Sequence, residues 1–135
     1  MKKFYFLFLL MLISMQSCKS QTAQSGSISI HYKAQTRGFL YEIQLENDTL
    51  IKINSTKTLK IKLNKNQISN LKDIIATIDF SKIKNNTDTE GLAVDKAIAA
   101  NFTITTKQKT YNYQLIHRKL PKKIQEVLDY LDQLE

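Results

Sequence analysis

Apolar and polar residues alternate over two neighbouring stretches, residues 27–35 and 39–45. A period of two is typical of strands that bury one face. Pairing Ala34 with Phe39 places both apolar sets on the same side of a sheet, and Gly38 beside the short loop can take a positive φ. We therefore predict a first antiparallel hairpin.

Two further strands follow, and loop length decides which face they bury. A two-residue loop after the second strand sets Ile51 and Ile53 opposite polar residues, whereas a three-residue loop at residues 47–49 sets them opposite apolar ones. A one-residue slip turns every side chain to the other face. We predict the three-residue loop, a second one at residues 55–57, and a four-strand meander that ends with residues 59–63.

The period then changes to that of a helix, with apolar residues at Ile68, Leu71, Ile75 and Ile78. Asn64 and Gln67 have the spacing of a capping box at its start. We predict a helix over residues 64–77.

Alternation returns over residues 98–104 and 111–115, which predicts a hairpin with its turn at residues 107–108. Pro121 suits the first position of a last helix, whose buried stripe consists of Ile124, Val127, Leu128, Leu131 and Leu134. The sum is an α+β domain in which a four-strand meander, a helix, a hairpin and a C-terminal helix form an antiparallel sheet of about six strands, with helices on one face.

The first residues have the pattern of an export signal. Lys2 and Lys3 precede an apolar run over residues 4–13, which is shorter than the ~20 residues that span a bilayer and fits the apolar region of a signal peptide. Ser17 and Cys18 then resemble a lipobox of the looser form found in Bacteroidetes lipoproteins. The resemblance implies cleavage before Cys18 and its acylation, for example with palmitate, so that several chains at ~0.8 kcal/mol per CH₂ anchor the protein.

This reading divides the chain into a lipoprotein signal peptide (1–17), a lipidated polar tether (18–26) and a single α+β domain (27–135). Removing Lys2 and Lys3 from the 20 basic side chains leaves 18 against 12 acidic ones, or about +6. Surface-exported Bacteroidetes lipoproteins often carry acidic residues just after the cysteine, and here residues 19–22 contain none. We therefore expect anchoring in the outer membrane, facing the periplasm.

The chain also resembles a family of small, functionally uncharacterised lipoproteins of flavobacteria and their relatives. The matching residues are Thr-Arg-Gly at 36–38, Ala-Val-Asp-Lys-Ala at 93–97, and His117 shortly before Pro121. The resemblance covers most of the mature domain. It implies a compact lipoprotein domain and carries no established activity.

Composition argues against several classes of function. One cysteine allows neither an internal disulfide nor a cysteine-based metal cluster. Three glycines are too few for a dinucleotide or phosphate-loop cradle. His31 and His117 lack an acidic partner at ligand spacing, and His31 falls on the polar face of its strand. Tyr111 and Tyr113 fall on the core face, away from any nucleic acid. We expect no metal, cofactor or nucleic acid.

The most charged motif stands at the predicted start of the last helix and comprises His117, Arg118, Lys119, Lys122 and Lys123. Free N–H groups at a helix start favour anions, and positive charges there oppose the helix dipole. A bound anion or acidic partner relieves that conflict. The alternative is a solvated basic turn.

Asp95 and Arg37 are the candidate ligand-binding residues. The predicted hairpin sets Ile98 opposite His117, which brings Asp95 near this basic motif. An Asp–His pair is either a general base or a salt bridge that fixes the end of a strand. The alternative function is therefore a small-ligand-binding or hydrolytic domain that uses Asp95 and His117.

Two surface features complete the set of candidates. Asp48-Thr49-Leu50, on a predicted exposed turn, resembles the O-glycosylation motif of Bacteroidetes envelope proteins, so Thr49 is a candidate modification site. Lysines such as Lys52, Lys60 and Lys62 suit solubility and attraction to anionic head groups. We expect a non-enzymatic binding or accessory domain for an envelope or secreted protein, tethered by Cys18.

Overall fold

The computed structural model describes residues 27–90, 97–107 and 109–135. Six strands form one antiparallel sheet in the order β4-β3-β2-β1-β5-β6, with bounds β1 Ser29–Thr36, β2 Phe39–Glu46, β3 Thr49–Asn54, β4 Lys57–Lys62, β5 Ala99–Thr105 and β6 Thr110–Ile116. Helices α2 (Lys65–Ala76) and α3 (Lys122–Asp132) and the 3₁₀ turn η1 (Phe80–Lys82) complete the fold. The predicted α+β class and strand number are confirmed.

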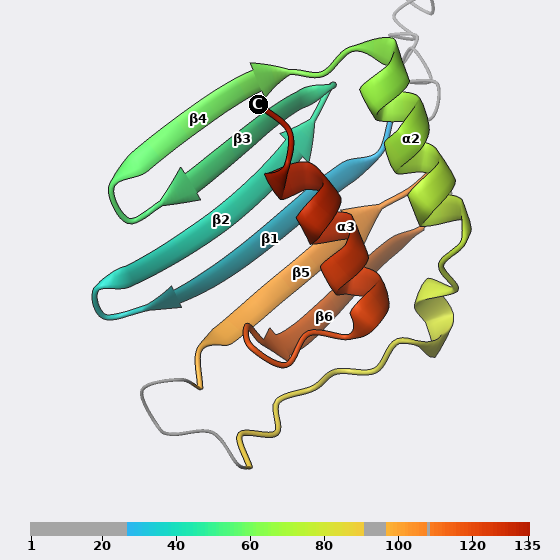
Figure 1. Cartoon of the computed structure of the whole chain (residues 1–135). Coiled ribbons are helices and arrows are strands. Elements are labelled where there is room, and N and C mark those ends of the chain that lie inside the picture. Colours follow the sequence, from blue (N-terminus) through green and yellow to red (C-terminus); the bar gives the residue numbers. More distant parts are fainter. Residues whose placement is uncertain (1–26, 91–96, 108) are drawn as a thin grey trace, which may run out of the picture.

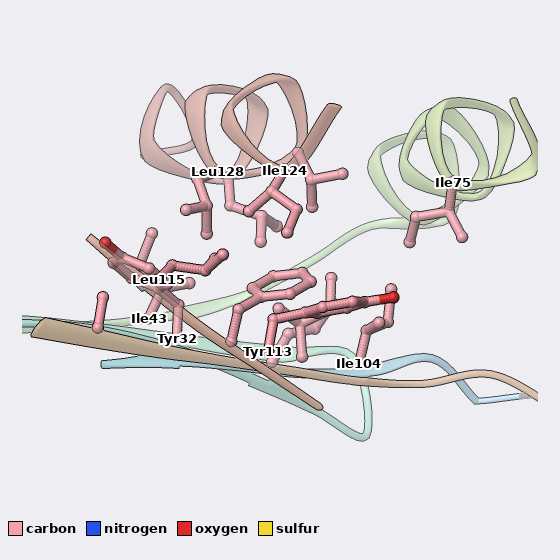
Figure 2. Close-up of a cluster of buried hydrophobic side chains, with 14 of the residues drawn as sticks. Tyr32, Ile43, Ile75, Ile104, Tyr113, Leu115, Ile124 and Leu128 are labelled. Atoms are coloured by element: carbon pink, nitrogen blue, oxygen red, sulfur yellow. The ribbon is translucent and has the colours of Figure 1, made fainter. Parts of the chain in front are cut away.

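Both helices cover the same side of the sheet (Figure 1). Their buried residues, among them Leu71, Ile75, Ile124 and Leu128, meet the apolar side chains of β1, β2, β5 and β6 in one core. Figure 2 shows Ile75, Ile124 and Leu128 pointing from the two helices toward the sheet. Within the described ranges, no helix is long and apolar enough to cross a membrane.

The first hairpin buries the expected face through a different register. Thr36 pairs with Phe39 and Ala34 with Tyr41, so the predicted pairing of Ala34 with Phe39 is wrong by two residues. A shift of two leaves every side chain on its face, and the apolar alternation therefore survives. Gly38 has φ +87° in the turn, as predicted.

The next two loops are shorter than predicted, and this changes which side chains are buried. Glu46 pairs with Thr49 around the turn Asn47-Asp48, and Asn54 pairs with Lys57 around Ser55-Thr56. Both predicted three-residue loops are therefore wrong. Asn47 and Asp48 both have positive φ, as in the type I′ turn whose twist matches a β-hairpin.

The two-residue turn reverses the predicted faces of β3. Leu50 and Lys52 join the covered face, opposite Leu45 and Ile43. Ile51 and Ile53 lie on the other face, where they stay half-buried. The charged residue Lys52 therefore lies on the helix-covered face, close to the C-terminal end of α3.

The helix signals behave as predicted at α2 and nearly so at α3. Asn64 and Gln67 form the reciprocal capping box, and Thr77 ends α2. The sequence predicts Pro121 as the first residue of the last helix. It is instead the N-cap residue, and α3 begins at Lys122. The Tyr130 hydroxyl donates to the Gln67 carbonyl at 2.9 Å and joins the two helices.

The last hairpin has the predicted register. Thr105 pairs with Thr110, and the His117 amide donates to the Ile98 carbonyl at 2.9 Å. Ile98 therefore lies opposite His117, as expected from the sequence.

Lys52 stabilises the end of α3. Its ammonium donates to the carbonyls of Asp132 (2.8 Å) and Leu134 (2.7 Å). The C-terminal end of a helix carries partial negative charge, so a cation there is favourable.

We expect Lys52→Met to lower the free energy of unfolding by about 1 kcal/mol, because it keeps the apolar stem and removes the ammonium. Urea denaturation measures this. Lys60→Met, on the opposite face of the next strand, is the matched control and should change stability by less than about 0.5 kcal/mol. Equal losses in both variants would contradict the role of Lys52.

Candidate functional site

The structure divides the basic motif that the sequence places at the start of the last helix. His117 turns inward and its Nδ1 lies 2.5 Å from the Tyr32 hydroxyl. The Lys119 ammonium donates to the Glu90 carbonyl. Arg118, Lys122 and Lys123 are exposed, and Lys123 pairs with Glu126 at 2.9 Å. The anion or partner site at this motif stays a prediction.

His117 lies among aromatic rings from the first hairpin. Its ring centroid is 5.5 Å from that of Phe39, 5.6 Å from that of Tyr41 and 5.9 Å from that of Tyr32. These four residues line a cavity of about 320 Å³, together with Asp129 and Asp132 of α3. We call this cavity the aromatic recess.

Burial controls the protonation of these rings. It lowers the pKa of His117 below its ordinary value, and the positive charge of Arg118 lowers it further. Burial raises the pKa of the Tyr32 and Tyr41 hydroxyls well above the usual range, and for Tyr41 the carboxylates of Asp132 and Asp129 add to the effect. At neutral pH the recess is therefore walled by uncharged rings.

Of the two residues that the sequence analysis names as ligand-binding candidates beside His117, the structure describes only Arg37. Arg37 is exposed in the turn between β1 and β2. Asp95 lies outside the described residues, as do Cys18, the signal peptide and the tether. A general-base role for an Asp95–His117 pair therefore stays a prediction.

Thr49 does not lie on the exposed turn where the sequence analysis expects it. It is the first residue of β3, pairs with Glu46 and Lys62, and is half-buried. The two-residue turn places Asn47 and Asp48 at the tip instead. O-glycosylation of Thr49 stays a prediction, but its context is a strand.

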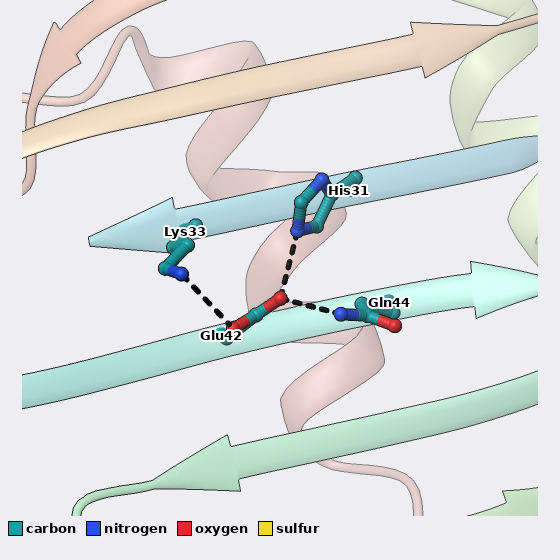
Figure 3. A network of polar contacts seen from close by, with 4 residues as sticks. All are labelled: His31, Lys33, Glu42 and Gln44. Carbon is teal, nitrogen blue, oxygen red and sulfur yellow. Dashed lines mark hydrogen bonds and ion pairs between the residues drawn. The ribbon is translucent and has the colours of Figure 1, made fainter. Parts of the chain in front are cut away.

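The opposite side of the sheet carries a second arrangement that the sequence analysis did not find. Figure 3 shows it in front of the strands, with α3 behind them. Glu42 is only 7% exposed. Its Oε1 lies 2.8 Å from His31 Nε2, the Gln44 amide donates to the same oxygen, and Lys33 Nζ is 3.9 Å from Oε2.

These contacts decide the charge of Glu42. Burial alone raises the pKa of its carboxyl, but the hydrogen bonds from Gln44 and His31 and the charge of Lys33 outweigh it, so the pKa lies below its ordinary value. A buried carboxylate is retained only where it is paired and hydrogen-bonded. The network therefore holds four side chains in fixed positions on β1 and β2.

This side of the sheet, which no helix covers within the part of the chain that the structure describes, we call the open face. Two rows of paired residues cross it: Thr58, Ile53, Glu42, Lys33, Asn101 and Gln114, and beside them Lys60, Ile51, Gln44, His31, Thr103 and Asn112. His31 is exposed on the polar face, as predicted. Ile51 and Ile53 lie side by side on β3, next to the edge strand β4, and give this part of the face an apolar patch.

Metal binding finds no support in the residues that the structure places. Among residues 27–90, 97–107 and 109–135, no three His, Cys, Asp or Glu side chains come together in a group able to hold a metal ion.

A larger hollow of about 490 Å³ lies between α2 and the turn Asn47-Asp48. Neither a histidine nor an aromatic ring lines it.

Searches of protein-family models, curated proteins and solved structures give no significant match to this chain. The lipoprotein-family resemblance therefore stays a prediction. The geometry and charge of the described side chains carry the functional proposals.

We expect stability to fall as the pH drops from about 6.5 to 5.5. The pKa of His117 is lower in the folded chain than its ordinary 6.5, so below pH 6.5 the unfolded chain binds a proton at His117 more tightly than the folded chain does. The stability that the neutral His117 contributes is therefore complete above pH 6.5. Below that pH the free energy of unfolding declines by at most about 1.4 kcal/mol per pH unit.

Thermal or urea denaturation across this range measures the effect. His117→Gln keeps a hydrogen-bonding group near the Tyr32 hydroxyl but does not titrate, so its stability should depend less on pH. The same slope in both proteins would show that His117 is not the titrating group.

Proposed function

We propose that the protein is a non-enzymatic binding or accessory domain, lipid-anchored in the outer membrane, that holds an envelope or secreted protein against its open face. One observation carries the proposal: both helices pack on one side of a six-stranded sheet, and none of the described helices covers the other side. That side combines half-buried Ile51 and Ile53 with ordered polar side chains. Interfaces commonly join apolar area to polar groups that make hydrogen bonds, and here the apolar patch lies on β3 beside the polar network of β1 and β2.

Charge favours a partner with an acidic surface. The carboxylate of Glu42 is already paired within the domain. Lys60 and Lys62 are exposed on the open face, and the Lys62 ammonium also donates to the Asn47 carbonyl at 2.9 Å. Without residues 1–17 the chain carries 18 basic against 12 acidic side chains, or about +6. Complementary charge steers a partner to such a face and sets its orientation, while Ile51 and Ile53 supply apolar area to bury.

The anchor fits a role at the membrane. An acylated Cys18 followed by only eight residues before the domain begins at residue 27 would keep the domain close to the bilayer. The open face would then lie within reach of membrane-bound neighbours.

Cys18→Ser should move the protein from the membrane pellet to the supernatant of lysed cells, because the acyl chains are lost. Immunoblotting of the two fractions measures the change. Mass spectrometry of the wild-type protein should find an acylated Cys18 as the mature N-terminus. A wild-type N-terminus that retains residues 1–17, or an unmodified Cys18, would contradict the anchor.

The contact face is tested by paired charge reversals in intact cells. A tagged full-length chain is cross-linked, purified under denaturing conditions and analysed by mass spectrometry. We expect one dominant envelope or secreted protein, whose yield falls at least about fivefold with Lys60→Glu/Lys62→Glu. Lys65→Glu/Lys72→Glu, exposed on α2, changes charge equally and should leave the yield within about twofold.

Three outcomes would contradict the open face as the contact surface. Equal losses in both double variants would indicate general charge attraction. Loss with Arg118→Glu/Lys122→Glu alone would assign the contact to the start of α3. Binding of the acyl-free domain to anionic vesicles, with no attached protein in cells, would indicate a lipid surface.

The alternative, a small-ligand-binding or hydrolytic domain, is favoured by the position of His117 in the aromatic recess. It requires Asp95→Asn and His117→Ala to leave the fold intact while abolishing a ligand-induced rise in melting temperature. Loss of folding in both variants would instead assign these residues a structural role.

A further inference from the structure

The aromatic recess lies on the helix-covered side of the sheet, away from the open face. Its walls come from β1, β2 and the segment before α3, so residues 85 positions apart meet in it. Phe39, Tyr41 and His117 are each only partly buried and present ring surface to the cavity. Its volume is about 320 Å³. Binding sites for small molecules have volumes of roughly 300–1,000 Å³, so the recess is large enough for a small ligand.

The edge of the recess is negative, although the chain as a whole is basic. Asp129 and Asp132, the aspartate pair, lie one turn apart on α3, and neighbours at this spacing share a helix face. Both carboxylates act on the Tyr41 hydroxyl, which places their charge beside the rings. The Gln125 amide donates to Asp129 at 2.6 Å and orients that carboxylate.

Among the described residues, two cations lie near the recess, and neither lines it. Arg118, whose charge acts on His117, is exposed, and the second cation is Lys52. Its ammonium is engaged by the backbone carbonyls of Asp132 and Leu134, and it lines a neighbouring hollow instead. Aromatic π-faces and carboxylates both attract positive charge. Because the aromatic rings and the two carboxylates line the same cavity, this cavity favours a ligand that is positively charged as well as small.

We propose that the aromatic recess binds a small organic cation of the alkylated ammonium class. The rings face its alkyl groups and the aspartate pair balances its charge. An alkylated ammonium binds water more weakly than a bare one, so it loses less on entering an aromatic site. Leu120 and Leu128 extend the apolar wall that its alkyl groups contact. This site is independent of the partner proposed for the open face.

Choline and its neutral carbon isostere, 3,3-dimethylbutan-1-ol, test the proposal because they share a shape and differ in charge. Each is titrated by NMR into the full chain, held in a maltoside detergent. We expect choline to bind saturably, with its N-methyl resonance shifted upfield by the rings. The neutral isostere should bind at least about tenfold more weakly.

Two sets of variants assign the site. Asp129→Asn/Asp132→Asn should weaken choline binding at least about tenfold, while Asp48→Asn/Asp73→Asn, which removes two charges elsewhere on the surface, should change it less than twofold. Phe39→Leu keeps an apolar side chain but removes a π-face, and it should weaken choline binding several-fold without affecting the isostere.

Further arms distinguish the source of the cation and define failure. Binding of choline without binding to phosphatidylcholine vesicles indicates a free small cation, whereas competition by those vesicles indicates a lipid head group. Equal affinity for choline and its isostere would reduce the recess to an apolar hollow and overturn the proposal. No saturable choline binding, or equal losses in both double variants, would overturn it as well.

Discussion

The packing of α3 against the sheet is the contact on which the other features depend. Ile124, Val127 and Leu131 are fully buried by it, and burying aliphatic side chains of this size stabilises by roughly 1.5–3 kcal/mol each. The same contact sets the aspartate pair beside Tyr41 and brings the end of α3 to Lys52. Because both helices share one side of the sheet, the opposite side has no cover of its own within the described chain.

Alternation and helical period predicted every strand and both helices, since the side-chain period of each element is a local property. Register was less predictable. Burying Ile51 and Ile53 favoured a three-residue loop, yet the type I′ turn at Asn47-Asp48 places Leu50 and Lys52 under the helices. The preference of Asn47-Asp48 for a two-residue turn therefore outweighed the burial of two isoleucines. Asn and Asp tolerate positive φ, so that dipeptide was the signal for the shorter loop.

The candidate sites were less predictable because they join distant parts of the chain. His117 reads as a member of a basic run, and only the folded chain shows its hydrogen bond to Tyr32, 85 positions away. The Glu42 network likewise depends on the pairing of β1 with β2, which sets Lys33 opposite Glu42 and His31 opposite Gln44. Sequence alternation placed His31 on the polar face but could not name its acidic partner.

Thiol labelling in intact cells tests most directly whether the open face is an interface. Single cysteines at Asn101 on β5 and Asn70 on α2 replace exposed residues on opposite sides of the domain, and the acylation proposed for Cys18 would keep that thiol out of the reaction. Labelling rates are compared between cells and the purified chain. The account predicts that Asn101→Cys is protected in cells at least several-fold while Asn70→Cys is not. Equal labelling of Asn101→Cys in cells and after purification would contradict it.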